Sequence, residues 1–394
     1  MKTLEIAIEG AIPTDVGIEI AKRACYCDQL ITSCRFIEAG GILHIELQDN
    51  ANLEDVEIKA RKLVAKMKSG RLQIKPEIIR QRETTRSSLF AASGADYTGL
   101  YRQGLGTMAR GEEFLEILAR IDRLFQRLGV EHFGAVPQEY NVLIPTDWLR
   151  KAGYLSSFPH SLTFAIHLKE DYDGIARFSE RHAGLKELNL DSIDEFETPE
   201  YCLSPAVCYH TYGLLSSTHF TPDDNGLKVF TAVNRCFRYE SKNMANVERL
   251  WEFSMREIVL VGERDRVLKE RERGLDMIWK MVEMFDLTAF IETAVDPFFT
   301  SDFQSKRFFQ LANQLKYELR MPVRDNDTIA VGSFNYHEDF FGDRFGIQTA
   351  DGSRVHTGCI AFGLERFVHA VLLQLGVDET RSRLQAAEQL FLGK

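Results

Sequence analysis

Apolar and polar positions are patterned differently in residues 1–85 than in the rest of the chain, which suggests two structural units. Residues 4–12 and 42–47 have the β-rich composition of strands, and two further segments show apolar residues at helical spacing. These helices are expected near residues 14–28 and 53–68. The order of strand, helix, two strands and helix predicts a small α+β domain, which we place at residues 1–85.

The second unit, residues 95–394, begins with a long amphipathic helix. Apolar residues recur at helical spacing over 111–129, and Gly129 suits the position just after a helix end. Short β-rich runs follow over 200–260. Strands in succession with helices among them predict an α+β fold class built on an antiparallel sheet. The later helices are expected at 264–285, 304–318 and 362–375.

The composition is that of a soluble globular protein, with 44% apolar and 27% charged residues among 394. The first residues have the character of neither a secretory signal nor a transit peptide, and no apolar run approaches the about 18 residues of a membrane helix. We therefore expect a cytoplasmic protein that does not engage a membrane. Seven cysteines with no CxxC pair argue against a disulfide framework or a short-spaced zinc finger. A metal site built on cysteines would have to be assembled from distant segments.

A formal net charge of −10 does not favour a nucleic-acid binder as a whole, because phosphate contacts require clustered Lys and Arg. One segment departs from this balance. Residues 59–86 contain ten basic residues and only Glu77 and Glu83 as acidic ones. This basic segment fits a solvated helix face with a linker, and it also fits a docking face for an acidic partner.

Residues 236–241 and 249–261 are two extended runs joined by a polar loop, which is typical of a β-hairpin. Side chains two apart on a strand share a face, so one face would present an arginine, two glutamates and an aromatic ring. Those groups suit a nucleotide, because a guanidinium can hold an α-phosphate, a ring can support the purine and a carboxylate can accept hydrogen bonds. A surface strand pair with cross-strand ion pairs fits the same pattern. The side chains concerned are Cys236, Arg238 and Glu240 on the first strand and Phe253, Met255 and Glu257 on the second.

Three segments resemble the signature motifs of the class II aminoacyl-tRNA synthetases. FRYES followed by ERLWEFSMREIV resembles motif 2, which reads FRxE, a variable loop and RxxxF. HTGCIAFGLERFVHAVL resembles motif 3, and the helix after its FGLER turn has an apolar stripe that leaves Arg366 to one side. Residues 111–129 with the extended segment ending at Pro145 would be motif 1, the dimer element. The motifs cover residues 95–394 in the family's order, so the resemblance implies a homodimer with an antiparallel catalytic sheet flanked by helices.

The same resemblance implies a site that binds ATP and forms an aminoacyl-adenylate. Arg238 would hold the α-phosphate and Phe253 would stack on the adenine, with Glu240 beside it. Arg249 and Arg366 would hold the γ-phosphate of a bent ATP. Attack of a carboxylate on the α-phosphorus is catalysed mainly by positioning and by neutralising charge, so few other groups are required.

Mg²⁺ is implied as well, but its ligands are not evident. Many class II enzymes place a metal-binding carboxylate shortly before the residue that corresponds to Asn335, and here apolar residues and a glycine occupy that stretch. Asp327 or Glu338 could take its place. The metal arrangement around ATP therefore departs from the family pattern.

In three further positions the chain resembles the zinc-dependent archaeal-type seryl-tRNA synthetases and their relatives, the amino acid:carrier-protein ligases. These enzymes hold Zn²⁺ through Cys, Glu and Cys, which correspond to Cys208, Glu257 and Cys359. Two thiolates and a carboxylate leave a fourth position open, as in catalytic zinc sites, and that position would bind the α-amino group of the substrate. Glu252 is a competing carboxylate, but strand alternation places it on the face opposite Phe253.

The carrier-protein ligases are the closer resemblance of the two. AGYLSSFPH, PAVCYH and GSFNYHEDFFG all resemble segments of that group, which loads glycine or alanine onto the phosphopantetheine thiol of a carrier protein. The resemblance implies activation of a small amino acid, whether glycine, alanine or a serine-like one, and transfer to an acidic carrier protein. Asn335 would face the adenylate or the amino acid.

Two other functions remain open at this point. Typical carrier-protein ligases lack the N-terminal unit, which resembles the tRNA-binding extension of the archaeal-type synthetases, so a compact seryl-type synthetase that charges tRNA is the alternative enzyme. A paralogue that binds without catalysing is the non-enzymatic alternative. Carrier proteins and tRNA are both acidic, so the basic segment suits either partner. The small domain could grip tRNA, dock a carrier protein or only stabilise a dimer, and the sequence leaves the amino acid undetermined.

Overall fold

The computed structural model describes residues 1–392 except for short gaps. The gaps are residues 9, 11, 13, 69–75, 93–98, 184–194, 221–225, 241–243, 245, 297–302 and 326. Arg71 and Lys75 of the basic segment, and Ser241 at the end of the FRYES run, lie outside the described residues. Across the part of the chain that the structure describes, no helix has the length and apolar character needed to cross a membrane.

A small domain at the N-terminus has the predicted order of strand, helix, two strands and helix. Its antiparallel sheet has the strand order β1-β3-β2, and its two helices share one hydrophobic core with that sheet. Ile20, Leu43 and Ile45 are fully buried in this core, which is separate from the core of the large domain. The predicted first helix ends earlier than residue 28, because the chain turns after Ala24. The elements are β1 (Lys2–Ala7), α1 (Thr14–Ala24), β2 (Ile31–Ile37), β3 (Ile42–Leu47) and α2 (Leu53–Lys68).

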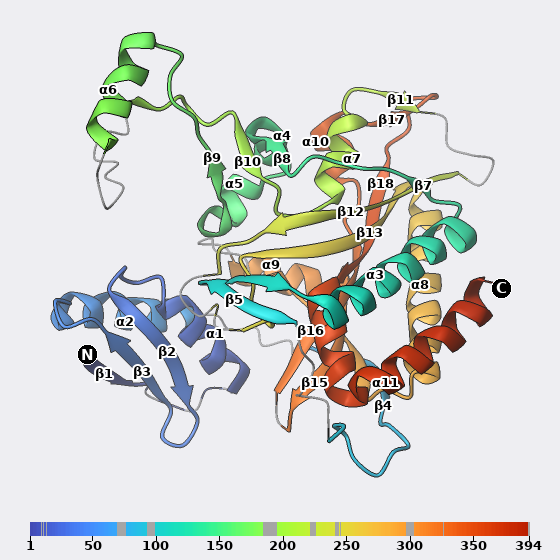
Figure 1. The fold of residues 1–394 in the computed structure, drawn as a ribbon, viewed down its shortest axis with the longest axis horizontal. Coiled ribbons are helices and arrows are strands. Elements are labelled where there is room, and N and C mark those ends of the chain that lie inside the picture. Colours follow the sequence, from blue (N-terminus) through green and yellow to red (C-terminus); the bar gives the residue numbers. More distant parts are fainter. Residues whose placement is uncertain are drawn as a thin grey trace.

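The large domain is organised around an eight-stranded sheet with the order β4-β14-β15-β16-β18-β13-β12-β7 (Figure 1). Every neighbouring pair is antiparallel except β12 and β7. β4 was predicted to belong to the small domain of residues 1–85, but it pairs with β14 of the large sheet. The bounds are β4 (Ile78–Arg82), β7 (Val136–Pro137), β12 (Leu227–Phe237), β13 (Glu252–Gly262), β14 (Ala289–Thr293), β15 (Lys316–Arg324), β16 (Asp327–Tyr336) and β18 (His356–Gly363).

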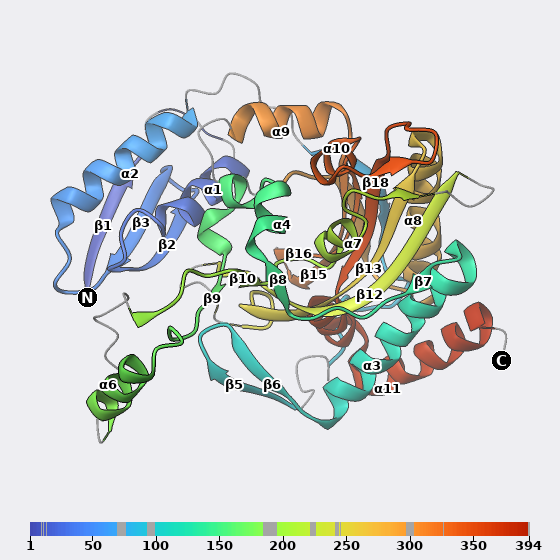
Figure 2. The ribbon, with the colours of Figure 1, turned by 90° about the horizontal axis from the view of Figure 1, so that it is seen from above.

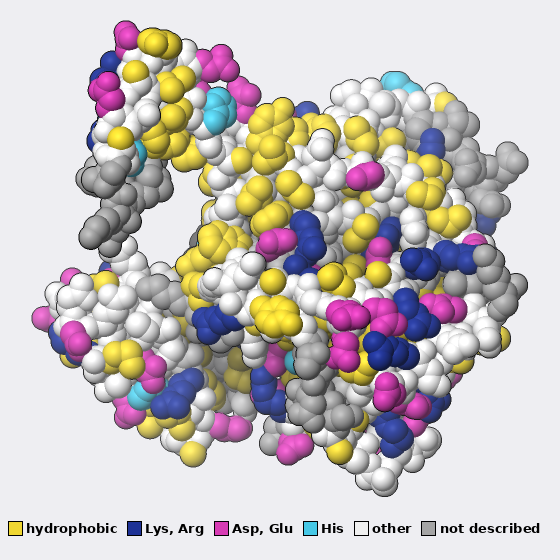
Figure 3. Space-filling model, in the orientation of Figure 1, with side chains coloured by type: hydrophobic (Ala, Val, Ile, Leu, Met, Phe, Trp, Pro, Cys, Tyr) yellow, Lys and Arg dark blue, Asp and Glu magenta, His cyan; other side chains and the backbone are white. Residues whose placement is uncertain are grey.

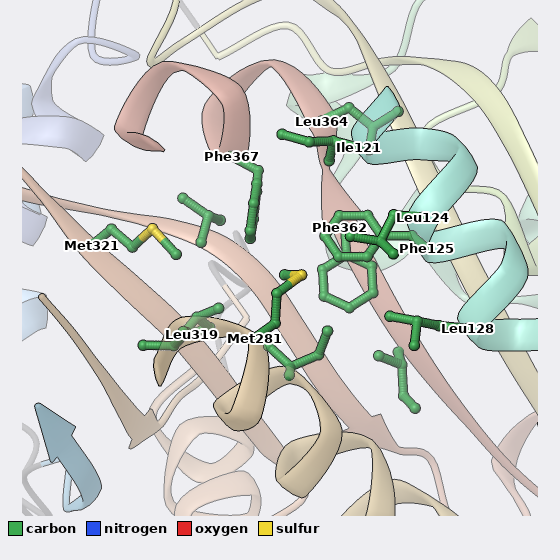
Figure 4. Packing of buried hydrophobic residues seen from close by; sticks show 14 of the residues in the cluster. Ile121, Leu124, Phe125, Leu128, Met281, Leu319, Met321, Phe362, Leu364 and Phe367 are labelled. Atoms are coloured by element: carbon green, nitrogen blue, oxygen red, sulfur yellow. The ribbon is translucent and has the colours of Figure 1, made fainter. Parts of the chain in front are cut away.

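Three long helices cover one face of this sheet: α3 (Glu112–Arg127), α8 (Arg264–Met284) and α11 (Leu364–Leu392). Their apolar side chains pack against alternate sheet residues such as Ile258 and Phe362. Phe125 of α3 stacks on Phe362 with ring centroids 4.0 Å apart, as Figure 4 shows. Because strand side chains alternate, the neighbours of these core residues must point to the opposite face. The face opposite the three long helices therefore carries the remaining side chains of each strand, both apolar and polar.

Shorter elements lie over that opposite face and around the edges of the sheet. α7 and α10 pack there against Val259 and Cys359. α6 projects on an arm away from the sheet, and apolar side chains gather on it in Figure 3, with Tyr172 86% exposed. These elements are β5 (Leu100–Gly104), β6 (Thr107–Arg110), β8 (Leu143–Pro145), α4 (Thr146–Lys151), α5 (Tyr154–Ser157), β9 (Phe164–Ala165), α6 (Tyr172–His182), β10 (Tyr201–Leu203), α7 (Cys208–Leu214), β11 (His219–Phe220), α9 (Phe303–Ala312), α10 (Phe340–Phe345) and β17 (Gln348–Thr349).

The predicted helix over 304–318 is wrong in its second half. α9 ends at Ala312, and β15 begins at Lys316. The run KYELRM from Lys316 alternates charged and apolar side chains with a period of two, which a strand satisfies and a helix does not. The last predicted helix, 362–375, begins at Leu364 and continues past a kink at Gly376, whose φ is 72°.

The basic segment is divided between the two domains. Its first part lies on α2, and its last part includes β4 of the large sheet. On β4, Arg80 pairs with Asp276 at 2.5 Å and Arg82 pairs with Asp286 at 2.7 Å. These two arginines have structural partners in the large domain, and on α2 Lys59 pairs with Asp28 and Arg61 with Glu57, so the docking face stays a prediction.

Candidate active site

The predicted hairpin is formed by β12 and β13, and it brings the proposed nucleotide ligands to one face. Cys236 lies opposite Phe253 in the register, and the Arg238 amide donates a hydrogen bond of 2.9 Å to the Trp251 carbonyl, which continues the pairing beyond the strand end. The Arg238 guanidinium lies 5.5 Å from the centre of the Phe253 ring. Arginine and ring therefore occupy one surface, as strand alternation predicted.

Arg366 comes from a distant segment to the same place. It lies in the first turn of α11, and its Nε donates a hydrogen bond of 2.7 Å to the Glu248 carbonyl in the motif 2 segment. Burial lowers the pKa of the Arg366 guanidinium; Glu240 opposes this, while the charges of Arg249 and Arg238 lower the pKa further. The four nucleotide-site candidates thus share one electrostatic environment. A cluster of cations of this kind is suited to a polyphosphate, whose negative charge offsets their mutual repulsion.

A carboxylate that sequence reasoning missed also lies here. Glu318 of β15 is within electrostatic range of Arg366 and forms ion pairs of 3.2 Å with both Lys316 and Arg320. These three β15 residues alternate with buried apolar ones and so face the side of the sheet opposite the three long helices. The alternation of charged and apolar residues in KYELRM would have indicated Lys316, Glu318 and Arg320 as one strand face if the segment had not been assigned to a helix.

The two carboxylates proposed for Mg²⁺ lie at opposite ends of the Asn335 strand region. Asp327 begins β16, pairs with Arg324 at 3.0 Å and is 64% exposed. Eight residues separate it from Asn335, which corresponds to roughly 26 Å along a strand. Glu338 lies just past the strand end, in a left-handed backbone conformation with φ 54°. Which carboxylate serves Mg²⁺ stays a prediction.

Cys208, Glu257 and Cys359 come together from three distant segments. Their ligand atoms all lie within 4.8 Å of one another, and the three residues are only 5%, 1% and 4% exposed. Cys208 begins α7, Glu257 lies on β13 and Cys359 on β18. The register of β13 and β18 pairs Val259 with Cys359 and Glu257 with Ala361, so both ligand side chains project from the face opposite the three long helices. Strand alternation correctly predicted that Glu257 would face the same side as Phe253.

The electrostatics of this group suit a cation. The Val207 amide donates a hydrogen bond of 3.0 Å to Glu257 Oε1, whereas buried Oε2 has no hydrogen-bond partner in the described structure. Burial raises the pKa of the Glu257 carboxyl. The pKa of the Cys208 thiol is raised mainly by a hydrogen bond with Cys359 and also by burial. Three acidic groups cannot all ionise in such a site unless a positive charge joins them. Two thiolates and a carboxylate are ligand types that Zn²⁺ takes, with a fourth position left for substrate.

The competing carboxylate, Glu252, is placed differently. Its Oε1 lies 3.6 Å from Arg235, and it stands opposite Phe237 at the end of the hairpin. The geometry thus brings Glu257, and not Glu252, to the two cysteines.

Asn335 of β16 and His337, just past the end of that strand, border the Cys359 thiol. Asn335 Nδ2 donates a hydrogen bond of 3.3 Å to Cys359 Sγ, and His337 Nε2 lies 4.0 Å from the same sulfur. Burial lowers the pKa of His337 to about 4, so its ring is neutral near pH 7. Tyr212 of α7 lies behind it, with 3.4 Å between its hydroxyl and His337 Nδ1. Sequence reasoning singled out Asn335 but missed His337, which lies just past the end of β16.

The two halves of the site adjoin. Arg238 is among the charges that act on Glu257, where it opposes the effect of burial. The cationic, ring-bearing half therefore lies beside the thiol and carboxylate half on a single sheet face. Such a surface can hold a nucleotide and a metal-bound or amine-bearing substrate next to each other.

Comparison with known proteins first defines the class. Residues 192–374 match the family model for the tRNA synthetase class II core domain (G, H, P, S and T). The fold resembles that of M. kandleri seryl-tRNA synthetase in its crystal structure with A. aeolicus tRNASec, with a TM-score of 0.68 at 19% identity over 98% of this chain and 77% of that one. The predicted class II, α+β fold is confirmed. A class II core implies ATP, with Mg²⁺, as co-substrate.

The particular family follows from sequence relatives. Amino acid–acyl-carrier-protein ligase 1 of Bradyrhizobium diazoefficiens is 32% identical over 308 residues, which are 77% of this chain and 87% of the relative. A type-2 serine–tRNA ligase of Methanothermobacter thermautotrophicus is 24% identical over 278 residues, 70% of this chain and 54% of the relative. The chain belongs to the family of amino acid–acyl-carrier-protein ligases, as its motifs predicted.

Proposed function

We propose that this ligase activates a small amino acid with ATP and transfers it to the phosphopantetheine thiol of an acidic carrier protein. Family membership supports adenylate formation and the carrier protein as acceptor. The observation that carries the proposal is the adjacency of two groups on one sheet face. Arg238, Phe253 and Arg366 offer a nucleotide site, and beside them Cys208, Glu257 and Cys359 offer an amine-selecting metal site.

In the proposed first step, an oxygen of the amino acid carboxylate attacks the α-phosphorus of ATP, and pyrophosphate leaves. Arg238 neutralises the charge that develops on the α-phosphate, while Arg249 and Arg366 hold the departing phosphates. Phe253 supports the adenine, with Glu240 beside it. Preorganised cations in a site of this kind contribute mainly by stabilising charge in the transition state.

In the proposed second step, the carrier's thiol attacks the carbonyl carbon of the adenylate. A thioester forms, AMP leaves with the electron pair of the broken bond, and the thiol proton passes to solvent. Asn335 would hold the amino acid or the adenylate during both steps. The protein's part is again positioning, because the mixed anhydride is already activated.

Cys208, Glu257 and Cys359 would hold Zn²⁺. When bound, the ion would supply an open coordination position for the α-amino group, which selects amino acids over acids that lack an amine. The unpartnered Glu257 Oε2 and the proximity of two thiols support this assignment.

The surroundings of the thiols support a small amino acid. Tyr212 stacks on Phe341 with ring centroids 4.7 Å apart, and the His337 ring lies 4.9 Å from the same phenylalanine. Tyr212 and Phe341 belong to the buried cluster that contains Cys208 and Cys359. Bulky side chains next to the amine site favour glycine, alanine or a serine-like amino acid, because close-packed interiors do not yield readily to extra volume.

Pyrophosphate exchange tests the activation step. The chain is expected to exchange labelled pyrophosphate into ATP in the presence of one or a few small amino acids out of the twenty, and a metal chelator is expected to abolish this. Binding of ATP and amino acid without exchange would instead favour a non-catalytic paralogue. Exchange followed by charging of tRNA alone would favour the compact seryl-type synthetase.

A further inference from the structure

A buried carboxylate, that of Glu365, lies at the junction between β18 and α11. It belongs to the first turn of α11, directly before Arg366. An acidic residue in a first turn favours a helix by itself, because it complements the positive end of the helix dipole. An exposed carboxylate would serve that purpose equally well. The burial of Glu365 therefore needs another explanation, which its hydrogen-bond partners supply.

Ser254 of β13 donates two hydrogen bonds to this carboxylate. Its amide lies 2.7 Å from Glu365 Oε2, and its hydroxyl lies 2.9 Å from Oε1. The pairing of β13 with β18 ends at Met255 and Gly363, because the chain turns into α11 at Leu364. The Glu365 side chain therefore replaces the missing strand residue as the acceptor for the Ser254 amide.

Arg110 supplies the opposite charge. Its Nη2 lies 2.8 Å from Glu365 Oε1, and the two side chains are only 9% and 1% exposed. Arg235 lies 3.5 Å from the same oxygen, but its side chain is 38% exposed. Arg110 ends β6, and Figure 2 shows the β5–β6 hairpin leading into α3. One carboxylate thus joins the chain before α3 to both β13 and α11.

This buried ion pair contributes a fixed geometry more than stability. Taking both charges out of water offsets most of their attraction, so a buried pair is weak evidence for stability. Arg366, the next residue, is also fastened to the motif 2 segment, through the 2.7 Å hydrogen bond from its Nε to the Glu248 carbonyl. Ser254, the partner of Glu365, adjoins the proposed adenine platform, Phe253. The contacts of Glu365 therefore fix Arg366 relative to Phe253.

We infer that Glu365, held by Ser254 and Arg110, is a positioning residue that sets the spacing between the adenine platform and the γ-phosphate ligand, Arg366. This inference rests on the proposed ATP site. A bent triphosphate is bound well only if both groups are held at the spacing that it requires. Glu365 touches no substrate, and its effect passes through Arg366. Its loss should therefore weaken binding of the triphosphate and leave binding of AMP nearly unchanged.

Equilibrium binding of a non-hydrolysable ATP analogue and of AMP to the full chain tests this. Glu365→Gln keeps the side-chain volume, but its NH₂ group cannot accept the hydrogen bonds that Ser254 and Arg110 donate. It is expected to weaken binding of the analogue about tenfold and that of AMP less than about twofold. Ser254→Ala removes only the hydroxyl bond and should weaken binding of the analogue about threefold. This milder variant carries the test if Glu365→Gln does not fold.

Asp122→Asn is the matched control for a merely structural role. Asp122 of α3 forms a two-pronged ion pair of 2.7 and 2.8 Å with Arg256, which shares a face of β13 with Ser254. Breaking this pair is expected to lower the melting temperature without changing the ratio of analogue affinity to AMP affinity. In an Arg366→Met background, Glu365→Gln is expected to cause no further loss of analogue affinity, because it acts through Arg366.

Three results would overturn the inference. These are an unchanged affinity ratio in Ser254→Ala and in Glu365→Gln where it folds, an equal change of the ratio in Asp122→Asn, and a further loss in the Arg366→Met background. Amino-acid-dependent pyrophosphate exchange by the unmodified chain is measured in parallel. Its absence would count against the proposed function alone, because the comparison of ATP analogue with AMP does not depend on catalysis.

Discussion

Replacing Glu257 by glutamine separates the metal-binding role of this residue from its packing role. Glutamine has nearly the same volume, and its side-chain oxygen can still accept the 3.0 Å hydrogen bond from the Val207 amide. What is lost is the negative charge beside Cys208 and Cys359. The variant is therefore expected to fold, but to hold a divalent cation much more weakly.

The size of the effect follows from linkage. A ligand at 100 times its dissociation constant stabilises the folded state by about 2.7 kcal/mol. With an unfolding entropy of about 2.1 cal/mol/K per residue, 394 residues give about 0.8 kcal/mol/K, so Zn²⁺ should raise the melting temperature by about 3 °C. If Glu257→Gln weakens binding about 100-fold, the same free Zn²⁺ contributes only about 0.4 kcal/mol, or about 0.5 °C.

Thermal melts of chelator-treated protein, titrated with buffered Zn²⁺, measure this difference, and a colorimetric chelator counts the bound metal. Glu252→Gln is the matched control, because Glu252 lies beside Arg235 and away from the cysteines. It is expected to keep the full metal-dependent shift. A full shift in Glu257→Gln, or its loss in Glu252→Gln, would refute the assignment of the metal ligands.

Three further changes test other parts of the structure. Arg238→Met should lower kcat for pyrophosphate exchange by about 100- to 1000-fold with little change in the melting temperature, because it removes one preorganised cation from the transition state. Phe253→Ala should raise the KM for ATP about tenfold by removing the platform for adenine, which exchange kinetics at varied ATP would show. Burial opposes a low pKa for Asp286, but hydrogen bonds from Thr85, Arg82 and Thr84 hold it below its usual value. Its stabilising effect is therefore present at neutral pH and lost as pH falls through the folded-state pKa. Asp286→Asn should cost about 2–3 kcal/mol in urea unfolding at pH 7 and less at pH 4.

The side-chain positions that the sequence predicted are those governed by strand alternation within one motif. Arg238, Phe253 and Glu257 share a face because the hairpin pairs Cys236 with Phe253. The alternation of side chains along each strand is enough to predict this shared face. The meeting of Cys208 with Cys359 depends on packing of α7 over the sheet. No local pattern encodes that contact, and only resemblance to a family suggested it.

The parts that the sequence did not predict depend on contacts between segments far apart in the chain. Glu318 was hidden because its strand was taken for a helix. β4 was assigned to the small domain because its partner strand, β14, lies far along the sequence.

The most direct test of the account is to offer both acceptors to the chain at once. With ATP, Mg²⁺ and a labelled small amino acid, we expect label on a carrier protein that bears phosphopantetheine, as a thioester that hydroxylamine or excess thiol releases. The same carrier protein without the prosthetic group should stay unlabelled. Label found on tRNA alone, with none on the phosphopantetheine-bearing carrier, would contradict the central claim.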